Sequence, residues 1–474
     1  MRQAAEPDAT ERLLRHVVAI VVLALSLAWA QPSRAAPDIT FSLSSDEPLT
    51  YPASIHYLPD EHTTIVGARD PRLDLPTRGP PATYDFWVAM ANEVGGARHG
   101  DAFVLQTSDF HNFRFAPGFG DAHHGGAVFW SPHPGSGNCS YPGVTHFDEQ
   151  YAAPGSVLQD PTLPPGNLIM IYEAEIHCPA APAGMAAGWV SIGVARSSDG
   201  GRTWPAPVSG PGLERDWLAY GDDRYAGVTL PGSPPAQGLD SFYGDSLPSA
   251  FIDDMDRVGS GGVYIYTPYQ FTGSPGVRAD ARIHIARARL DTRPGALRQR
   301  LHFMKWYAGG WTQEGRGGLE EGVVPPCGAI YGEGGAQISY NDALRRYMMT
   351  FVCTTYRCPT ANNCEPINLS LYYSTATSLA AQDWTRPQLI ENSTRPYRTA
   401  PNGAKIIDGG YPSFVSPGCR PGHLGLTGMV FLLDGDPLGE RRFVVRSFTI
   451  RPGRPIAMDG AGSSNGCSTA GAHG

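Results

Sequence analysis

The 474-residue chain is poor in charged side chains and has almost no lysine. Charged residues make up 17% of the sequence, and among its 36 basic residues only Lys305 and Lys405 are lysines. Acidic residues outnumber basic ones, which gives a formal net charge of −9. Nucleic-acid-binding proteins usually carry a basic stripe, so this balance argues against nucleic acid as a partner. The shortage of lysine indicates a compositional bias of the genome rather than a function.

Long segments with the period of an α-helix are also missing. The chain contains 57 glycines and 43 prolines, and both residues interrupt helices and form turns. Hydrophobic residues still reach 41%, and aromatic residues 10%. That is enough apolar material for a large core and argues against wholesale disorder. Short runs rich in β-branched and aromatic residues predict an all-β fold.

Only residues 17–30 form a strongly apolar run, and this run is too short to span a bilayer comfortably. Arg12 and Arg15 precede it, and the small residues Ala28 and Ala30 stand near its end. This pattern is typical of a secretory signal peptide. We therefore predict a signal peptide over residues 1–30, a secreted or periplasmic location, and no membrane attachment after cleavage.

The eight cysteines lack the CxxC and Cys–His spacings of zinc sites. An even number of cysteines behind a signal peptide predicts disulfides formed in an oxidising compartment. Their pairing does not follow from the sequence. Cys353, Cys358 and Cys364 stand close together and are interpreted as staples of a loop. No metal and no cofactor is predicted.

Strand-like runs separated by turns recur along the sequence in a fixed order. Each unit opens with small residues beside an acid or a tyrosine and continues with three strands. The openings are residues 159–162, 243–246, 331–334 and 410–413. Repeated strand units predict propeller blades or a solenoid. No linker divides the chain, so we expect one propeller domain over residues 31–455 and a flexible tail over residues 456–474.

The segment Ser197–Trp204 fits the pattern Ser-x-Asp-x-Gly-x-Thr-Trp in full. It resembles the Asp-box of sialidase-like and glycoside-hydrolase β-propellers, where it is a fold element and not a catalytic site. Asp199 is expected to accept hydrogen bonds from nearby amides, Gly200 and Gly201 to adopt positive φ, and Trp204 to pack under the blade. The resemblance implies a five-bladed β-propeller, or alternatively a six-bladed one of the sialidase type.

Weaker resemblances extend over most of the chain. Residues 105–113 and 374–387 are similar to blade endings, and residues 248–266 and 335–349 are similar to blade openings of glycoside-hydrolase propellers. The arginine motif of sialidases is missing, and Tyr411 resembles their nucleophile strand only loosely. A true sialidase is therefore a minority interpretation.

Acids at the blade openings are the candidate catalysts. Innermost strands of a propeller begin near its axis, where ligands bind, and glycoside hydrolysis needs two carboxyl groups. We expect Glu333 to be the general acid, because a semi-enclosed glutamate readily takes a raised pKa. Asp245 would be base, nucleophile or tuning partner, and Asp160 a third member. The alternative for each is a turn former, which is the commoner role of an acid beside glycine.

Further side chains are candidates for substrate binding. Glu173 and Glu175 continue a strand and rival the three acids. Aromatic and imidazole rings near the openings would contact sugar faces. The full set is Glu173, Glu175, Tyr243, Tyr331, Tyr411 and His123.

These observations predict a secreted glycoside hydrolase that cleaves a polysaccharide or glycoconjugate by a paired-carboxylate mechanism. The carbohydrate would be arabinan-like, sialylated or another glycan. Two alternatives stay open at this point. The first is a non-catalytic propeller that binds glycans or proteins. The second is an exo-sialidase with a tyrosine nucleophile.

Overall fold

A computed structural model describes the part of the chain that carries the fold. The described residues are 39–52, 83–94, 97–120, 127–130, 148, 151–177, 188–204, 215–219, 242–253, 262–272, 282–291, 301–327, 331–360, 363–392, 398–399, 405–435, 441–453 and 467. Within them every regular element is a β-strand, which confirms the all-β class. No helix in this part of the chain is long and apolar enough to cross a membrane.

The chain divides into two units, Met1–Ala36 and Pro37–Gly474. The predicted signal peptide, residues 1–30, lies outside the described residues. Of the predicted tail, only Cys467 is described, and it is buried. The signal peptide and the tail therefore stay predictions. All the described strands belong to the second unit.

The described strands form four sheets. The first contains β3 (Tyr84–Val94), β4 (Ala97–Thr107) and β5 (Arg114–Phe115). The second contains β6 (Tyr151–Gln159), β7 (Leu168–His177), β8 (Gly188–Ser197), β9 (Arg215–Ala219), β10 (Phe242–Ser246), β11 (Phe251–Asp253), β12 (Gly262–Thr272), β13 (Ile283–Asp291), β14 (Phe303–Tyr307) and β15 (Gly310–Glu314). The third contains β16 (Tyr331–Asn341), β17 (Arg346–Thr360), β18 (Asn363–Ala376), β19 (Gln388–Asn392) and β22 (His423–Leu424). The fourth contains β1 (Ile39–Leu43), β2 (Glu47–Pro48), β20 (Arg398–Thr399), β21 (Lys405–Val415), β23 (Thr427–Gly435) and β24 (Arg441–Pro452).

The ten-stranded sheet consists of two antiparallel parts joined by a short parallel contact. β8 and β10 pair in parallel only where Phe242–Gly244 meets Gly188–Val190. Dividing the sheet there gives five antiparallel groups of strands. They are group 1 (β3–β5), group 2 (β6–β9), group 3 (β10–β15), group 4 (β16–β19) and group 5 (β21, β23, β24 and β1).

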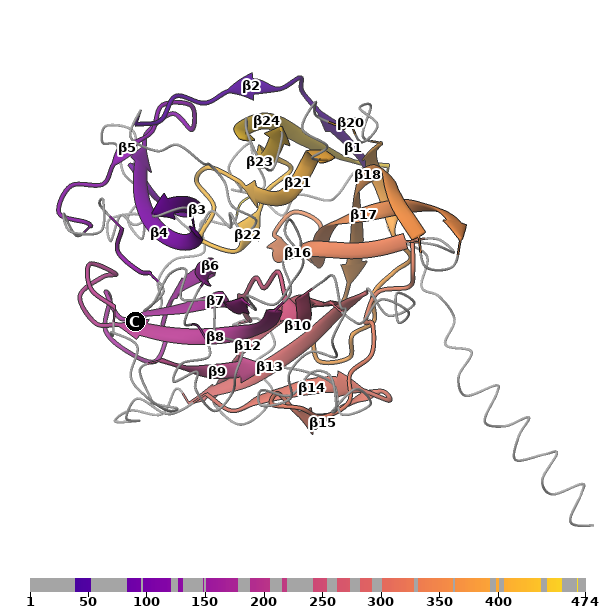
Figure 1. Cartoon of the computed structure of the whole chain (residues 1–474), viewed down its shortest axis with the longest axis horizontal. Coiled ribbons are helices and arrows are strands. Elements are labelled where there is room, and N and C mark those ends of the chain that lie inside the picture. Colours follow the sequence, from indigo (N-terminus) through magenta and orange to yellow (C-terminus); the bar gives the residue numbers. More distant parts are fainter. Residues whose placement is uncertain are drawn as a thin grey trace, which may run out of the picture. The chain divides into compact units, whose positions relative to one another are not determined.

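The five groups follow one another in Figure 1, and at each junction in the described residues a cluster of buried apolar side chains joins one group to the next. The last core joins group 5 back to group 1, where the rings of Phe86 and Phe431 lie 5.6 Å apart. Both faces of each group are therefore covered, which explains why nearly every large apolar side chain of the described strands is buried. The representative members of the other four cores are Trp87 and Met170, Ile171 and Ile265, Tyr266 and Phe351, and Leu371 and Phe414.

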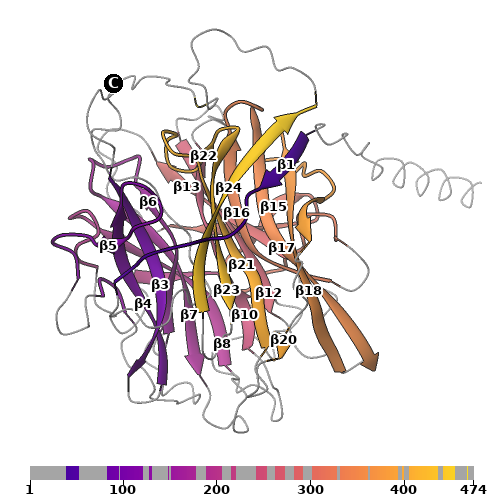
Figure 2. The same ribbon diagram turned by 90° about the horizontal axis from the view of Figure 1, so that it is seen from above.

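Group 5 is completed by the strand that comes first in the sequence. β1 pairs antiparallel with β24 from Ile39 to Leu43, and Figure 2 shows the two strands next to each other. The first and the last described strands are thus hydrogen-bonded into one sheet.

In Figure 1 the strands nearest the centre are β3, β6, β10, β16 and β21, which we call the innermost strands. Side chains that bond to backbone join innermost strands of neighbouring groups. Ser156 of β6 accepts a hydrogen bond from the amide of Ala250 at 2.8 Å. Ser249, between β10 and β11, donates to the carbonyl of Ala336 at 2.6 Å. Gln337 of β16 donates to the carbonyl of Phe414 and accepts from its amide. These three contacts occupy corresponding places, so they align the innermost strands with one another.

The Ser197–Trp204 segment forms a tight turn at the end of β8. Asp199 accepts hydrogen bonds from the amides of Arg202 and Thr203, both at 3.0 Å, and φ is positive at Gly200 and Gly201. Trp204 packs edge-on against Trp87 of the neighbouring group, with ring centroids 5.5 Å apart. The local geometry expected for these residues is confirmed.

The same kind of turn follows β4, and an aspartate also closes the loop after β18, with its acceptor at the other end of the loop. Asp109 accepts from the amides of His111 and Asn112, and Asp383 accepts from the amides of Thr377 and Ser378. The pKa of Asp109 and of Asp199 is lowered because these hydrogen bonds favour the carboxylate; for Asp199 they outweigh burial, which acts in the opposite direction. Two groups therefore share one kind of turn, and a third has an aspartate-bonded loop after its strand, which supports the repeat inferred from the sequence.

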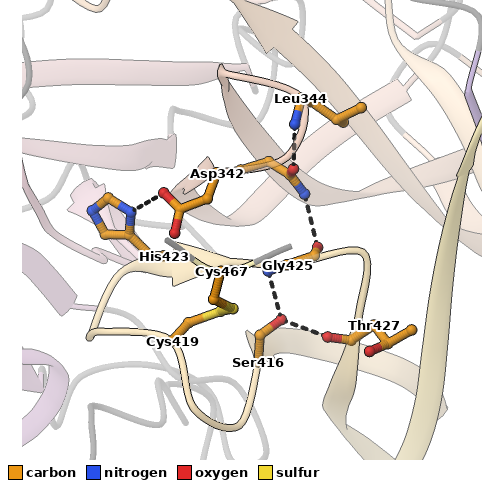
Figure 3. The surroundings of a disulfide bond; sticks show 9 residues. Asp342, Leu344, Ser416, Cys419, His423, Gly425, Thr427 and Cys467 are labelled. Atoms are coloured by element: carbon orange, nitrogen blue, oxygen red, sulfur yellow. Dashed lines mark hydrogen bonds and ion pairs between the residues drawn. A yellow bond between two sulfur atoms is a disulfide. The ribbon is translucent and has the colours of Figure 1, made fainter. Parts of the chain in front are cut away.

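Two disulfides lie within the described residues. One joins Cys327 to Cys353, and the other joins Cys419 to Cys467. Cys353 is thus paired outside the cluster that was interpreted as a stapled loop, and that segment forms the ends of β17 and β18. The interpretation is wrong for Cys353, which lies within β17, and for Cys358 and Cys364 it stays a prediction. Around the second disulfide, the His423 ring bonds to Asp342 and the Ser416 hydroxyl to the backbone of Gly425 and Thr427 (Figure 3).

Replacing Asp199 tests the turn. Asp199→Ala removes an acceptor used by two amides and the Thr203 hydroxyl, and we expect a loss of about 1–2 kcal/mol in the free energy of unfolding. Because the pKa of Asp199 is lowered by folding, this contribution is present above the unfolded pKa of about 3.9 and is lost as the pH falls further. Urea unfolding at pH 7 and pH 3 measures both effects. Ser198→Ala, an exposed change in the same turn, is the control and should be neutral.

Candidate active site

Asp245 and Glu333 take the same place in two neighbouring groups. Each lies four residues before the side chain that joins its strand to the next group, Ser249 and Gln337 respectively. The corresponding residue of β6 is Ala152, which carries no acid. Of these three innermost strands, two therefore present a carboxyl group at one level.

The backbone next to Glu333 is packed against the neighbours of Asp245. A Cβ atom on Gly334 would overlap the side chain of Gln270 and touch that of Leu247. Gln270 precedes Phe271, the register partner of Asp245. Glycine at 334 therefore lets the innermost strands of groups 3 and 4 approach this closely without displacing the Gln270 amide. The contact brings the starts of the two strands together.

Asp245 belongs to a buried cluster of charges. The Nζ atom of Lys305 lies 3.2 Å from Oδ2 of Asp245 and 2.8 Å from Oε2 of Glu320, and all three side chains are at most 1% exposed. The Tyr269 hydroxyl donates to Glu320 at 2.7 Å. Burial by itself lowers the pKa of Lys305, but Asp245 and Glu320 outweigh it and raise the pKa above its ordinary value. Lys305 therefore stays charged and stabilises a carboxylate at Asp245.

Glu333 lies in a different environment. Its carboxyl group is 2% exposed, and it accepts hydrogen bonds from the amides of Ile283 at 3.4 Å and Cys327 at 3.1 Å. Burial raises the pKa of Glu333 to about 7, although the two amides and the nearby charge of Arg282 act in the opposite direction. The raised pKa expected from the sequence is present. Near neutral pH, this carboxyl group can hold a proton that it can release to a substrate.

Two further acids come from group 2. Glu173 of β7 is buried, and its carboxylate accepts a hydrogen bond from the amide of Leu247, two residues after Asp245. Glu175 lies two residues further along β7 and is 7% exposed. The sequence gave both as alternatives to Asp245, Glu333 and Asp160. The structure places Glu173 against the backbone that follows Asp245.

Asp160 does not join this cluster. Across the sheet, Tyr151 pairs with Glu175, Glu175 with Val190, and Val190 with Gly244. The start of β6 is therefore level with Gly244 and the adjacent Asp245. Asp160 follows the other end of β6, roughly 25 Å away along the strand. It caps the turn there, accepts from the Thr162 amide and pairs with buried Arg196 at 2.8 Å.

The predicted third acid is therefore separated from the other two. The repeat was placed incorrectly in this unit, because β6 starts at Tyr151 and Asp160 closes it. The residue level with Asp245 is Ala152, whose side chain gives no signal of a site.

The remaining candidates are distributed as follows. Tyr243 lies in β10 and Tyr331 in β16, both near the starts of innermost strands. Tyr411 lies in β21, is half-buried and has a positive φ of 54°. Its backbone lies against Gly335, which places it beside the strand of Glu333. His123 lies outside the described residues.

Sequence reasoning missed the buried pair of Lys305 and Glu320. Lys305 is one of two lysines, and this rarity is the only signal that could have drawn attention to it. Two groups of possible metal ligands occur in the described residues, and each contains both sulfurs of a disulfide. A disulfide sulfur is not a thiolate, so neither group offers a metal site in the oxidised protein.

No known protein family matches the sequence, and no curated protein does either. Solved structures with some likeness include an N-acetylgalactosamine deacetylase from F. plautii, 13% identical, TM-score 0.43, covering 88% of this chain and 94% of that one. A mannose phosphorylase from Leishmania mexicana is 8% identical, TM-score 0.39, covering 86% and 88%. An α-L-arabinofuranosidase from Fusarium graminearum is 8% identical, TM-score 0.38, covering 85% and 97%. These TM-scores are below 0.5, so the likeness carries no argument about family or function.

The charge balance around Lys305 can be tested by stability measurements. Lys305→Met leaves two buried carboxyl groups without their cation, and we expect a loss of about 3–5 kcal/mol in the free energy of unfolding. The loss should be smaller at low pH, where the carboxyl groups are protonated. The triple variant Lys305→Met/Asp245→Asn/Glu320→Gln removes all three charges and should recover much of the loss. If the triple variant is no more stable than the single one in urea unfolding, the cluster is not held by charge compensation.

The contribution of Glu333 to stability should depend on pH in the opposite direction to that of Asp199. Folding raises its pKa from 4.5 to about 7, so the folded state favours the protonated form. The resulting stability is present below the unfolded pKa and is lost as the pH rises through 7. Glu333→Gln should match the wild type below pH 4.5 and exceed its stability by up to about 3 kcal/mol above pH 8. Thermal unfolding of both proteins between pH 4 and pH 9 measures the difference, and a constant difference would contradict the raised pKa.

Proposed function

We propose that the chain is a secreted or periplasmic glycoside hydrolase built on a five-bladed β-propeller. The five antiparallel groups are its blades, the five cores are the blade interfaces, and the β1–β24 pair closes the ring. The two described disulfides support folding in an oxidising compartment. The alternative of six blades lacks support in the described residues, because the cores already run from each group to the next and back to the first.

One observation carries the assignment of chemistry. At the starts of two adjacent innermost strands, one buried carboxyl group has a pKa raised to about 7, and the other is held beside a charged lysine. Glycosidic cleavage needs this difference, with one protonated acid and one ionised carboxylate. In the proposed mechanism Glu333 gives its proton to the leaving oxygen as the glycosidic bond breaks. Asp245 supplies the ionised carboxylate, which stabilises the positive charge on the sugar, attacks it or activates water.

The substrate would be a carbohydrate, either an arabinan-like polysaccharide, a sialylated glycan or another exopolymer. A net charge of −9 disfavours nucleic acid, which requires a basic surface, and does not disfavour a neutral glycan. Three tyrosines, Tyr243 of β10, Tyr331 of β16 and Tyr411 of β21, are proposed to contact sugar rings.

Product release from a broad glycan panel, detected by mass spectrometry, tests the proposal. We expect cleavage by the wild type and a loss of at least 100-fold in kcat/KM for Glu333→Gln and for Asp245→Asn. The alkaline limb of the wild-type pH profile should fall near pH 7, where Glu333 loses its proton. Glu314→Gln, an exposed carboxyl group paired with His302, is the control and should retain full activity.

Other outcomes redirect the assignment. Glu175 keeps 7% exposed surface whereas Asp245 has none, so Glu175→Gln and Glu173→Gln test whether group 2 supplies the second carboxylate. Full activity in both primary variants would move the site to these residues. Release of sialic acid by both variants would favour the tyrosine mechanism through Tyr411. Absence of cleavage by well-folded protein would favour a propeller that only binds glycans or proteins.

A further inference from the structure

The Cys327–Cys353 disulfide lies directly against Glu333. Cys353 is the register partner of Glu333 on β17, and its Cα lies 6.6 Å from that of Cys327. The Cys327 amide donates to Oε1 of Glu333 at 3.1 Å, and the Cys327 sulfur lies 3.5 Å from the same oxygen. The two sulfurs and a carboxylate oxygen of Glu333 are all within 4.8 Å of one another. The crosslink therefore forms one wall of the space that the carboxyl group occupies.

Cys327 ends a described segment that is fixed at several points. This connecting segment, residues 315–327, follows β15 and precedes β16. Glu320 ties it to Lys305, and the amide of Val323 donates to the carbonyl of Ile283 at 2.9 Å. Ile283 also donates its amide to Glu333. One segment thus contacts the surroundings of both candidate acids, and the disulfide is its only covalent attachment to β17.

We propose that the Cys327–Cys353 disulfide is a positioning element of the active site, which holds the connecting segment over the Glu333 carboxyl group and makes activity depend on an oxidised crosslink. This inference rests on the proposed function for its consequence in catalysis. The geometric part of it, the covering of Glu333 by the crosslinked segment, is independent of any substrate.

The direction of the effect follows from the surroundings of Glu333. Its raised pKa comes mainly from burial, whereas the Cys327 amide and the Arg282 charge lower it. The other nearby charges, Asp245, Lys305 and Glu320, belong to the neighbouring cluster. Breaking the crosslink removes both the cover and the Cys327 hydrogen bond. Since burial is the larger influence, the pKa of Glu333 falls, and less of the acid is protonated at neutral pH.

The chain offers a matched control. Cys327→Ser/Cys353→Ser removes the crosslink beside Glu333, and Cys419→Ser/Cys467→Ser removes the other described disulfide, which lies beside Asp342 and His423 (Figure 3). Infrared difference titration of the protonated carboxyl band, assigned with Glu333→Gln, reports the midpoint directly. We expect the first pair to lower the midpoint by at least one pH unit and the control pair to leave it unchanged. Loss of stability alone would affect both pairs.

Kinetics on a confirmed substrate give the second measurement. A fall of one unit from a pKa of about 7 reduces the protonated fraction at pH 7 about fivefold. We expect kcat of Cys327→Ser/Cys353→Ser to fall by that factor, with KM within twofold and the alkaline limb moved to lower pH. The control pair should keep the wild-type profile.

The outcomes separate the two proposals. A folded Cys327→Ser/Cys353→Ser protein with an unchanged carboxyl midpoint overturns the positioning role, whatever the glycan panel shows. A lowered midpoint without cleavage of any glycan supports the crosslink's role and counts against the hydrolase. If the serine pair does not fold, the wild type is reduced under native conditions, and alkylation with mass spectrometry shows which disulfide has opened. Loss of the carboxyl band on opening of Cys327–Cys353, and its return on reoxidation, supports the proposal; an unchanged band refutes it.

Discussion

The candidate site depends on the relative height of neighbouring innermost strands, which decides the residues of one strand that lie beside those of the next. Ser156, Ser249 and Gln337 each bond from one strand to the backbone of the next. Hydrophobic cores alone would hold the groups together without fixing their relative height, since apolar contacts have little directionality. The polar contacts between strands supply that direction. They bring Asp245 and Glu333, which are distant in the sequence, to one level.

The two carboxyl groups of the site have different surroundings, which favour the ionised form of one and the protonated form of the other. Asp245 shares a buried cation with Glu320, and Glu333 is surrounded by backbone and a disulfide. An isolated buried carboxylate is costly, so each acid needs its own solution. The first is charge compensation by Lys305, and the second is retention of a proton. The connecting segment, residues 315–327, contacts both surroundings, because its Glu320 pairs with Lys305 and its Cys327 lies against Glu333.

Much of the fold follows from local patterns. The alternating runs and the glycine- and proline-rich turns predicted strands, and Ser197–Trp204 predicted a turn whose hydrogen bonds are those expected. The weaker ending at Asp109 forms the same kind of turn, and at Asp383 the aspartate bonds to amides that precede it. These features are readable because a turn is determined by a few neighbouring residues. The start of β6 was not readable, since Ala152 takes the place that an acid takes in β10 and β16.

The sequence by itself determined the strands, the repeated turns and two of the acids at strand starts, because each depends on residues close together in the chain. Tertiary structure decided which acids meet. It separated Asp160 from the others, brought Glu173 against Leu247, and enclosed Lys305 between Asp245 and Glu320. It also paired Cys353, the register partner of Glu333, with Cys327. Burial and charge proximity raise or lower a pKa, and both arise only when distant segments pack together.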